Sequence, residues 1–509
     1  MFTMIFDYPS ALSLQNESGR GLSPVDLELA PESSVAVTED PECGADELCQ
    51  LIAQQLQPQT GSGSWAGHDW FALPASFRGD HIAYVGKEPW LFDMSLLENV
   101  RYGCFEEPDP TDDDKARDLA ERSGNTRLKS DDPWFADSPD AYERLHASLL
   151  ASGATDELIE MGMRMPLTAT VSDDFQRALL ALREPIADAL RAEQLDTHVQ
   201  RYDPGAFIDE FSIGENLLFA VATEARDWTD EASEGAWVDA LTRAGLLNEL
   251  LDIGVAANRE FVEMFAELPD NHRFFSDLGL FDARDLPDMQ RVAQRVDRLG
   301  TGQWVSADRW RILSLVLSLK PAKHRVVTIA LETQARIVQA RATLQSLVQQ
   351  DGFADLEPLD PAACCDGLSV FQNAVFGVLK GQDQSAHRRV RESVLRSLQD
   401  AGLERPVVDH ALSTQPGPGG RALRPALRQK LALARALTKP CTWLIVNRAL
   451  DALDPDSEAK VIEQVLRVKS DASVLWSPVH ASNASMFSTH VHLSASGEHS
   501  IQTPTDGQQ

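Results

Sequence analysis

The sequence predicts an α/β fold in which a large, mainly helical segment separates two parts of one sheet-containing domain. Apolar residues alternate or cluster at 25–29 and 35–37, as they do in strands, and an acidic turn and a helix follow them. A basic amphipathic helix at 428–437 leads into a short apolar strand at 443–446. Residues 104–380 have mostly helical periodicity. The chain therefore divides into three predicted parts: 1–103, 104–380 and 381–509.

The composition argues against several classes of function. The chain has 509 residues, of which 78 are acidic and 46 basic, and its net charge of −32 argues against binding to nucleic acid or to an anionic membrane surface. The six cysteines form no CxxC pair and no cluster with histidine, so neither a zinc site nor a disulfide framework is expected. The N-terminus does not resemble a signal peptide, and the most apolar run, 312–319, is far short of the ~20 residues that span a bilayer. We therefore expect a cytoplasmic protein without direct membrane insertion.

The first part contains a predicted sheet and a loop of the kind that binds phosphate. We expect the strands at 25–29 and 35–37 to belong to one sheet. An acidic turn at 38–48 leads into a helix whose apolar face continues to Leu56. A strand, a turn and a helix in this order are the context that a phosphate-binding loop needs. Residues 58–70 are rich in turn-forming residues and predict a hairpin.

One short pattern occurs three times along the chain, around Asn99, Asn216 and Asn373. Pro204 and Pro361 each precede the asparagine of their copy by 12 positions, and these two prolines lie 157 positions apart. Each copy predicts a turn, a short asparagine-bearing helix and a longer helix that ends in glycine. Such a unit is either a packing element or a docking surface for a partner. Between the last two copies, residues 326–350 predict one long helix.

Two stretches carry a family resemblance. Residues 78–103 read RGDHIAYVGKEPWLFDMSLLENVRYG, and residues 411–455 contain a helix, a strand and a tight Ala-Leu-Asp-Pro turn in that order. These stretches resemble the Q-loop segment, and the signature helix, second nucleotide strand and D-loop, of ABC-type ATPase cassettes. The resemblance covers about residues 5–502 and implies an ABC-type P-loop ATPase (RecA-like) core. The chain resembles a bacterial subgroup of ABC-transporter ATP-binding proteins whose long insert contains repeated ENLLFG-like segments.

Most positions that contact the nucleotide in this family have different chemistry here. The adenine-stacking aromatic falls at Tyr8. In the phosphate loop only the last glycine, Gly44, is present; the lysine falls at Ala45 and the serine or threonine at Asp46. Carboxylates such as Glu39 would repel a triphosphate, since a like-charge pair about 4 Å apart costs on the order of 4 kcal/mol. At the start of the following helix, the same negative charges are instead stabilising.

The Q-loop and signature positions also differ. The Q-loop glutamine, which the resemblance assigns to Mg²⁺ and the attacking water, falls at Lys87. The signature motif begins at Leu423, where Arg424 replaces its serine and both of its glycines are absent. Gly419 and Gly420, ahead of the motif, fit the family pattern, and so does the helix after it. The surface around the Q-loop contacts the membrane subunits in such cassettes.

The Asp-Glu pair that the family places after its second nucleotide strand falls at Asn447 and Arg448. Asn447 is a weak, uncharged ligand, and Arg448 cannot act as a base because a guanidinium group has hydrogen-bond donors and no acceptor. The D-loop is intact and contains Asp454. His480 lies one position from the switch histidine, and it is either functional or a surface or packing residue. We therefore predict no catalytic residue and no metal site.

These features predict a degenerate ABC-transporter cassette that does not hydrolyse ATP and acts as a regulatory or structural partner of a membrane transporter or of an active cassette. Hydrolysis of ATP coupled to transport would be the family activity, and ATP and Mg²⁺ would be cofactors only where residual binding survives. Two alternatives stay open: an ATPase with residual ATP binding that pairs with an intact cassette, and a soluble interaction scaffold unrelated to transport. The expected partners are an ABC permease or a second ABC cassette, which would hold the chain at the inner membrane.

Overall fold

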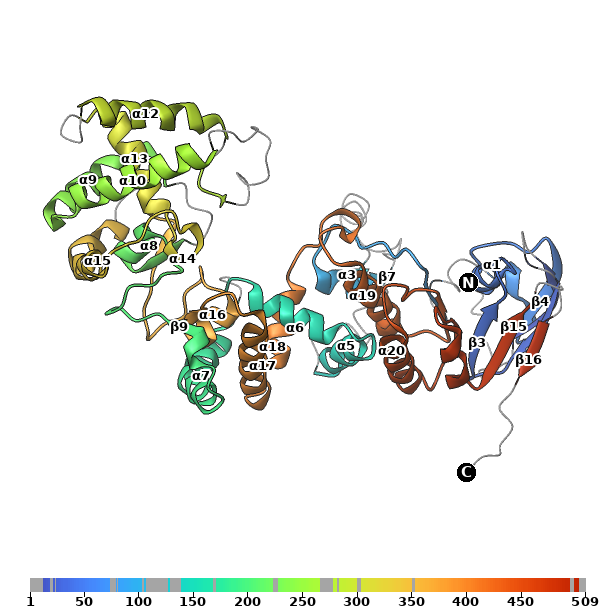
Figure 1. The fold of residues 1–509 in the computed structure, drawn as a ribbon. Helices are drawn as coiled ribbons and strands as arrows, with labels where there is room; N and C mark the ends of the chain where they lie inside the picture. Colours follow the sequence, from blue (N-terminus) through green and yellow to red (C-terminus); the bar gives the residue numbers. More distant parts are fainter. Residues whose placement is uncertain are drawn as a thin grey trace, which may run out of the picture. The chain divides into compact units, whose positions relative to one another are not determined.

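The computed structural model has a mixed α/β fold with a largely parallel main sheet, which confirms the predicted class (Figure 1). It describes residues 12–18, 22, 24–73, 79, 81–102, 105–106, 127–128, 139–167, 171–222, 228–265, 278–281, 283–299, 304–349, 353–494 and 499–502. The chain divides into two compact units. The first contains residues 1–161 and 408–509, and the second contains residues 162–407.

The central sheet of the first unit has six strands in the order β16-β15-β3-β14-β13-β6. Only the β15–β16 pair is antiparallel, and the other four pairs are parallel. The strands are β3 (Ser34–Glu39), β6 (Ile82–Val85), β13 (Trp443–Asn447), β14 (Ser473–Ser477), β15 (Thr489–Leu493) and β16 (His499–Gln502). The carboxyl ends of β3, β6, β13 and β14 meet at one edge, so the residues that follow these strands lie together there.

A second, antiparallel sheet in the first unit has the order β2-β1-β4-β5. Its strands are β1 (Leu12–Ser18), β2 (Val25–Leu29), β4 (Thr60–Trp65) and β5 (His68–Asp69). β2 and β3 therefore lie in different sheets, and the prediction that they share one is wrong. β2 buries alternate residues on one face, whereas β3 is buried along its middle because the main sheet is covered on both faces. The predicted hairpin at 58–70 is confirmed by the β4–β5 pair.

Both faces of the main sheet are packed. Trp443 and Ile445 of β13 contact one core, together with side chains of the antiparallel sheet and the helix after β3. Leu444 and Val446 contact a second core on the opposite face. The described helices of this unit, with two that cross its boundaries, are α1 (Ala45–Ile52), α3 (Leu96–Arg101), α5 (Pro139–Ala151), α6 (Thr155–Arg164), α18 (Glu404–Leu412), α19 (Pro425–Thr438) and α20 (Pro455–Val468). A short ladder joins β7 (Phe105–Glu106) to β8 (Arg127–Leu128).

The predicted helix at 428–437 and strand at 443–446 are confirmed by α19 and β13. The prediction that the apolar face of α1 continues to Leu56 is wrong. The helix stops at Ile52, Gln54 has a left-handed φ of 54°, and Leu56 is exposed. A left-handed residue cannot continue an α-helix, so Leu56 leaves the buried face.

The second unit is mainly helical. Its described helices are α7 (Asp173–Ala192), α8 (Ile213–Leu218), α9 (Glu234–Ala244), α10 (Leu247–Phe265), α12 (Leu286–Leu299), α13 (Ser306–Ser318), α14 (Pro321–His324), α15 (Leu331–Leu344), α16 (Val370–Val375) and α17 (Gln384–Asp400). Two antiparallel ladders pair β9 (Val199–Arg201) with β12 (Gly377–Leu379), and β10 (Ala220–Ala222) with β11 (Leu356–Pro358). Among the described helices of the whole chain, none combines the length and the apolar character needed to cross a bilayer.

The predicted helix over 326–350 is wrong at its start, because α15 begins only at Leu331. Residues 326–329 are four consecutive β-branched residues, which lose side-chain freedom in a helix, and they form an irregular segment here. Asn99, Asn216 and Asn373 lie in α3, α8 and α16, three short helices as predicted.

Candidate functional site

The predicted phosphate loop connects β3 to α1. Gly44 is the N-cap of α1 and has a φ of 94°, and a Cβ at this position would lie 2.8 Å from Cα of Leu22. Only glycine fits such a position. The carboxylate of Glu39 accepts a hydrogen bond of 2.9 Å from the backbone N–H of Ala45. A negative group from the chain itself therefore lies at the N-terminus of α1, where a phosphate-binding loop holds its ligand.

The positions that the resemblance assigns to the Mg²⁺ ligands contact each other directly. The side-chain amide of Asn447, at the buried end of β13, donates a hydrogen bond to the carboxylate of Asp46. The same amide lies 3.0 Å from the hydroxyl oxygen of Tyr84, and the second carboxylate oxygen of Asp46 accepts a bond of 2.7 Å from Gln50. Burial raises the pKa of the Tyr84 hydroxyl, although its bond with Asn447 acts in the opposite direction.

Arg448 lies at the edge of this cluster. Its backbone has a left-handed φ of 47°, and its N–H donates to the carbonyl of Ser477 at the end of β14. Its guanidinium Nη1 lies 3.6 Å from the Glu39 carboxylate. The cation at the position of the family's catalytic glutamate therefore balances the anion at the start of α1.

Gln429 of α19 joins two loops at the same edge of the sheet. Its amide donates to the Asp451 carboxylate and, at 3.4 Å, to the carbonyl of Lys87, and it accepts a bond of 3.1 Å from the N–H of Ala452. The ammonium group of Lys87 lies 3.8 Å from the Asp451 carboxylate. Lys87 is thus part of a polar bridge between the loop after β6 and the loop after β13.

The glycine turn before α19 packs against the loop after β6. Gly419 and Gly420 have φ angles of 68° and 71°, and a Cβ at Gly419 would lie 3.1 Å from the Trp90 ring. The N–H of Leu423 donates to the carbonyl of Gly420 at 3.0 Å. Arg424 is the N-cap of α19, is exposed, and makes no side-chain cap bond. These residues shape the start of α19.

His480 and Asp454 both stabilise local structure around α20. The carboxylate of Glu458 is fully buried, accepts from the backbone N–H of His480, and lies 2.9 Å from Nδ1 of its ring. Asp454 caps α20 by accepting from the N–H of Ser457 at 3.0 Å, and its bonds with the Ser457 hydroxyl and N–H lower the pKa of its carboxyl group. Tyr8 lies outside the described residues.

The residues present do not fit Mg-ATP. The N–H of Ala45 is bonded to Glu39, the loop has no lysine, and Asp46 is bonded to Asn447 instead of being free for a metal. Within the part of the chain that the structure describes, no three histidine, cysteine or carboxylate side chains are arranged to hold a metal ion.

Three buried or partly buried arginines were not singled out by the sequence. Arg183, Arg341 and Arg435 lie on α7, α15 and α19, with their guanidinium groups over the rings of Phe376, Phe219 and Phe92 respectively, at 4.2, 4.7 and 5.6 Å from the ring centre. Each one donates to backbone carbonyls of the loop before an asparagine-bearing helix. The one signal in the sequence is an arginine among apolar helical residues, and that signal alone does not name a partner.

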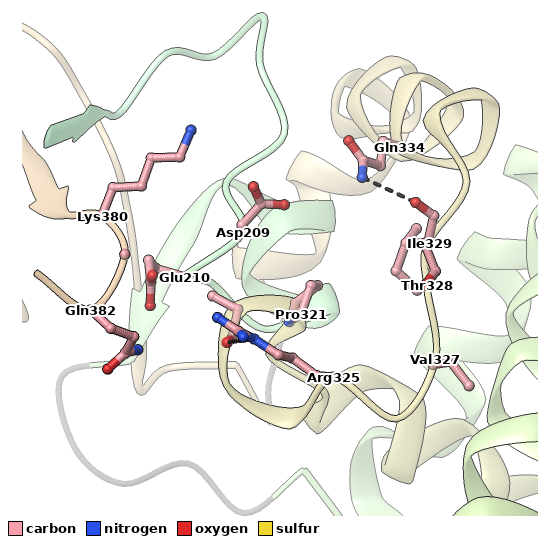
Figure 2. A pocket seen from close by; sticks show the side chains of 12 residues that line it. Asp209, Glu210, Pro321, Arg325, Val327, Thr328, Ile329, Gln334, Lys380 and Gln382 are labelled. Carbon is pink, nitrogen blue, oxygen red and sulfur yellow. Dashed lines mark hydrogen bonds between the residues drawn. The ribbon is translucent and has the colours of Figure 1, made fainter. Parts of the chain in front are cut away.

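A cavity of about 460 Å³ opens in the second unit (Figure 2). Side chains of both charges line it, including Asp209, Glu210, Arg325 and Lys380. Burial, and then the charge of Asp209, raise the pKa of the Glu210 carboxyl group. No sequence pattern predicted this cavity.

No protein-family model matches the chain. Parts of it are similar to ABC transporter proteins. The human mitochondrial potassium channel ATP-binding subunit is 32% identical over 124 residues, which are 24% of this chain and 15% of that protein. Multidrug resistance protein 4 of Entamoeba histolytica is 29% identical over 109 residues, 21% of this chain and 8% of that protein. The ABC-type transmembrane transporter verA of Clonostachys rogersoniana is 24% identical over 188 residues, 35% of this chain and 14% of that protein.

The matched regions thus span about one sixth or less of the length of these relatives. Among solved structures, a bacterial Atm1-family ABC exporter with ATP bound superimposes with a TM-score of 0.33 and 10% identity, over 96% of this chain and 37% of that one.

Proposed function

We propose that the chain is a degenerate ABC-transporter ATP-binding cassette that does not hydrolyse ATP and serves as a regulatory or structural partner of a membrane transporter or of an active cassette. The observation that carries this proposal is the hydrogen bond between Asn447 and Asp46. Two positions that would hold a metal in the family are joined to each other, so the framework is retained while its ligand groups are used for packing.

Hydrolysis needs a base or a polarising carboxylate next to the attacking water. Arg448 takes that position, and its guanidinium group has no acceptor that could receive a proton from water. Its guanidinium group lies near Glu39, which is itself bonded to the start of α1. A triphosphate would have to displace the Glu39 carboxylate from the N–H of Ala45 and then lie among several carboxylates without a lysine, an arrangement that disfavours binding.

A role as a partner is supported by what is preserved. Gly44, the helix α19 and the polar bridge made by Gln429 keep the β3, β6 and β13 loops together. The loops after β6 and β13 lie in the segments that resemble the Q-loop and D-loop regions of ABC cassettes. An ABC permease or a second ABC cassette, at the cytoplasmic face of the inner membrane, is the partner that this resemblance proposes.

Calorimetric titration with Mg-ATP tests the proposal. The wild-type chain should bind more weakly than a Kd of about 100 µM, which corresponds to roughly −5.5 kcal/mol. A variant with Ala45→Lys, Asp46→Ser, Asn447→Asp and Arg448→Glu restores the family's groups and should begin to bind. Tighter binding by the wild type would overturn the pseudo-ATPase assignment and favour the alternative, an ATPase with residual ATP binding that pairs with an intact cassette.

The partner role needs a separate test, in which the tagged full-length chain is expressed in its native cells and isolated with solubilised membranes. Recovery of an ABC permease or an intact cassette is the expected result. Recovery of neither, from membranes in which both are detected, would favour a scaffold without a tie to transport.

A further inference from the structure

Three segments of the chain share one local geometry; we call them module 1 (90–102), module 2 (202–221) and module 3 (359–378). Each contains a buried asparagine: Asn99, Asn216 or Asn373. Its side-chain oxygen accepts a hydrogen bond from a backbone N–H seven or eight residues earlier, at 2.8–2.9 Å. Each helix starts with a capping box built on a serine. These hydrogen bonds identify equivalent residues in the three modules, with one residue fewer between the bonded N–H and the asparagine in module 1.

Modules 2 and 3 pack against each other through equivalent faces. Their shared apolar cluster consists of five pairs of residues, each pair 157 positions apart: Tyr202 and Leu359, Ile208 and Cys365, Phe211 and Leu368, Phe219 and Phe376, and Val221 and Val378. The backbone bonds between the modules are reciprocal as well. The N–H of Tyr202 donates to Phe376 at 2.8 Å, and the N–H of Leu359 donates to Phe219 at 3.0 Å. This is a self-complementary, isologous contact within one chain.

Arg183 and Arg341 add a second pair of reciprocal hydrogen bonds. Arg183, which precedes module 2 in the sequence, donates to the carbonyl of Asn373 in module 3 at 2.9 Å. Arg341, which precedes module 3, donates to the carbonyl of Asn216 in module 2 at 2.8 Å. In the same crossed manner, β9, just before module 2, pairs with β12 at the end of module 3, and β11, just before module 3, pairs with β10 at the end of module 2. Each module is therefore held by segments that directly or closely precede the other module in the sequence.

Module 1 has the same face, and there it is exposed. Phe92 corresponds to Ile208 and Cys365, because the N–H of each is bonded to the asparagine of its module. Phe92 is 36% exposed, whereas Ile208 and Cys365 are 0% and 2% exposed. Tyr102 lies three residues after its asparagine, as Phe219 and Phe376 do.

Tyr102 is 37% exposed, against 9% and 4% for Phe219 and Phe376. Its ring stacks on Phe92 at 4.3 Å between ring centres, so the two form one aromatic surface, beside which Trp90 is 59% exposed. Aromatic side chains are enriched at contact sites between proteins.

We propose that this aromatic face of module 1 binds the same face of a second copy of the chain, in the way that modules 2 and 3 bind each other. The chain itself shows that two such faces are self-complementary. The proposal does not depend on whether the chain binds ATP. A self-complementary face is also consistent with a closed twofold dimer, the commonest symmetric assembly.

The dimer should be weaker than the contact between modules 2 and 3. β7, just after module 1, is already paired with β8, whereas β10, at the end of module 2, pairs with β11 from just before module 3. The second copy would thus be held by side chains without a strand ladder. The net charge of −32 on each copy adds repulsion, so added salt should strengthen the dimer by screening it.

Sedimentation velocity of the full-length chain over a range of concentrations tests the proposal. We expect reversible dimers that become tighter as salt is raised. Phe92→Glu and, independently, Tyr102→Arg should each raise the dimer dissociation constant at least about tenfold, since each places charge on the apolar face. Leu331→Glu is the matched control, because Leu331 is 81% exposed in the second unit and outside the face. It should leave the constant unchanged.

Circular dichroism and the unfolding midpoint of each variant distinguish loss of the dimer from loss of the fold. A wild-type chain that stays monomeric at all concentrations and salt levels overturns the proposal, as does a dimer that neither variant weakens. A monomeric chain whose co-purification with a permease is lost in Phe92→Glu also overturns it, and assigns the face to the transporter instead.

Discussion

The side-chain amide of Asn447 donates a hydrogen bond to the carboxylate of Asp46, and this bond joins the end of β13 to the first turn of α1. Asn447 is buried and Asp46 is exposed, so water can solvate one partner but not the other. A neutral amide beside a carboxylate needs no third group between them, whereas two carboxylates at this distance would need a cation.

Asn447→Asp should therefore destabilise the fold at neutral pH. The new carboxylate would lie against Asp46 and lose the donated hydrogen bond, at a cost of about 1–3 kcal/mol. Like charges raise the pKa of the pair, so the loss should shrink as the pH falls and one carboxyl group takes up a proton. Urea unfolding of the variant and the wild type at pH 5 and pH 7.5 measures both effects.

A double variant that exchanges the amide and the carboxylate between these two positions is the control. A double variant with Asp46→Asn and Asn447→Asp again has one amide and one carboxylate, and it should recover much of the lost stability. Simple additivity of the two single variants would show that the side chains do not interact.

Glu39→Ala should reduce stability by about 1–2 kcal/mol, because the N–H of Ala45 loses its acceptor and Arg448 loses a nearby anion. Glu39→Gln keeps an acceptor but not the charge, so its loss should be smaller. The difference in stability between the wild type and Glu39→Gln reports the loss of the charge, so it should fall with added salt, whereas the difference between the two variants should not. Equal stability of Glu39→Ala and the wild type, measured by thermal and urea unfolding, would rule out a capping role.

The sequence predicts best the features that depend on nearby residues. The helix at 428–437, the strand at 443–446 and the short helices around Asn216 and Asn373 were predicted from local sequence patterns. Which sheet a strand joins depends on distant pairing, so the strand at 25–29 could not be assigned to its antiparallel sheet.

Contacts of single side chains across long separations were equally inaccessible. Arg183 and Asn373 are 190 positions apart in the sequence, and nothing close to Arg183 indicates that it binds that carbonyl. The Asp46–Asn447 pair was visible as two substitutions in a resemblance, but its hydrogen bond was not, because β13 and α1 are 401 positions apart at these residues.

His324 should make stability depend on pH in the acid range. Its ring accepts from the N–H of Lys320 at 2.9 Å and lies 3.2 Å from the carbonyl of Leu278, and burial lowers its pKa to about 4. The unfolded chain binds this proton near pH 6.5, so the folded state is favoured fully above that pH and progressively less as the pH falls towards 4.

At pH 5, protonation of His324 in the unfolded chain should lower the free energy of unfolding by about 1–2 kcal/mol relative to its value above pH 6.5, after allowance for screening by solvent. His324→Asn retains an acceptor for the Lys320 N–H and does not titrate. The stability difference between the wild type and this variant should be constant above pH 7 and shift towards the variant between pH 6.5 and 4. A difference that does not vary with pH, measured by urea unfolding, would show that His324 is protonated equally in both states.

Arg183 and Arg341 each make several hydrogen bonds to carbonyls in a buried setting, and this sets the size of the effect expected on their removal. Arg183 donates to Asn373, Pro361 and Ala363. Burial lowers the pKa of Arg341 to about 10, so this guanidinium stays charged at neutral pH. A lysine has no planar fork and cannot reach three carbonyls at once.

Arg183→Met should cost about 3–5 kcal/mol, because it leaves the carbonyls of Asn373, Pro361 and Ala363 without their donor, and Arg183→Lys should recover only part of that. Hydrogen exchange should then show loss of protection in α7, which contains the substituted residue, and also in α16, which is far from it in the sequence. Arg201→Ala is the control, since its ion pair with Glu184 is exposed and worth about 0–1 kcal/mol. Loss of protection confined to α7 would mean that the two modules do not hold each other, and it would remove the precedent for a self-complementary face in module 1.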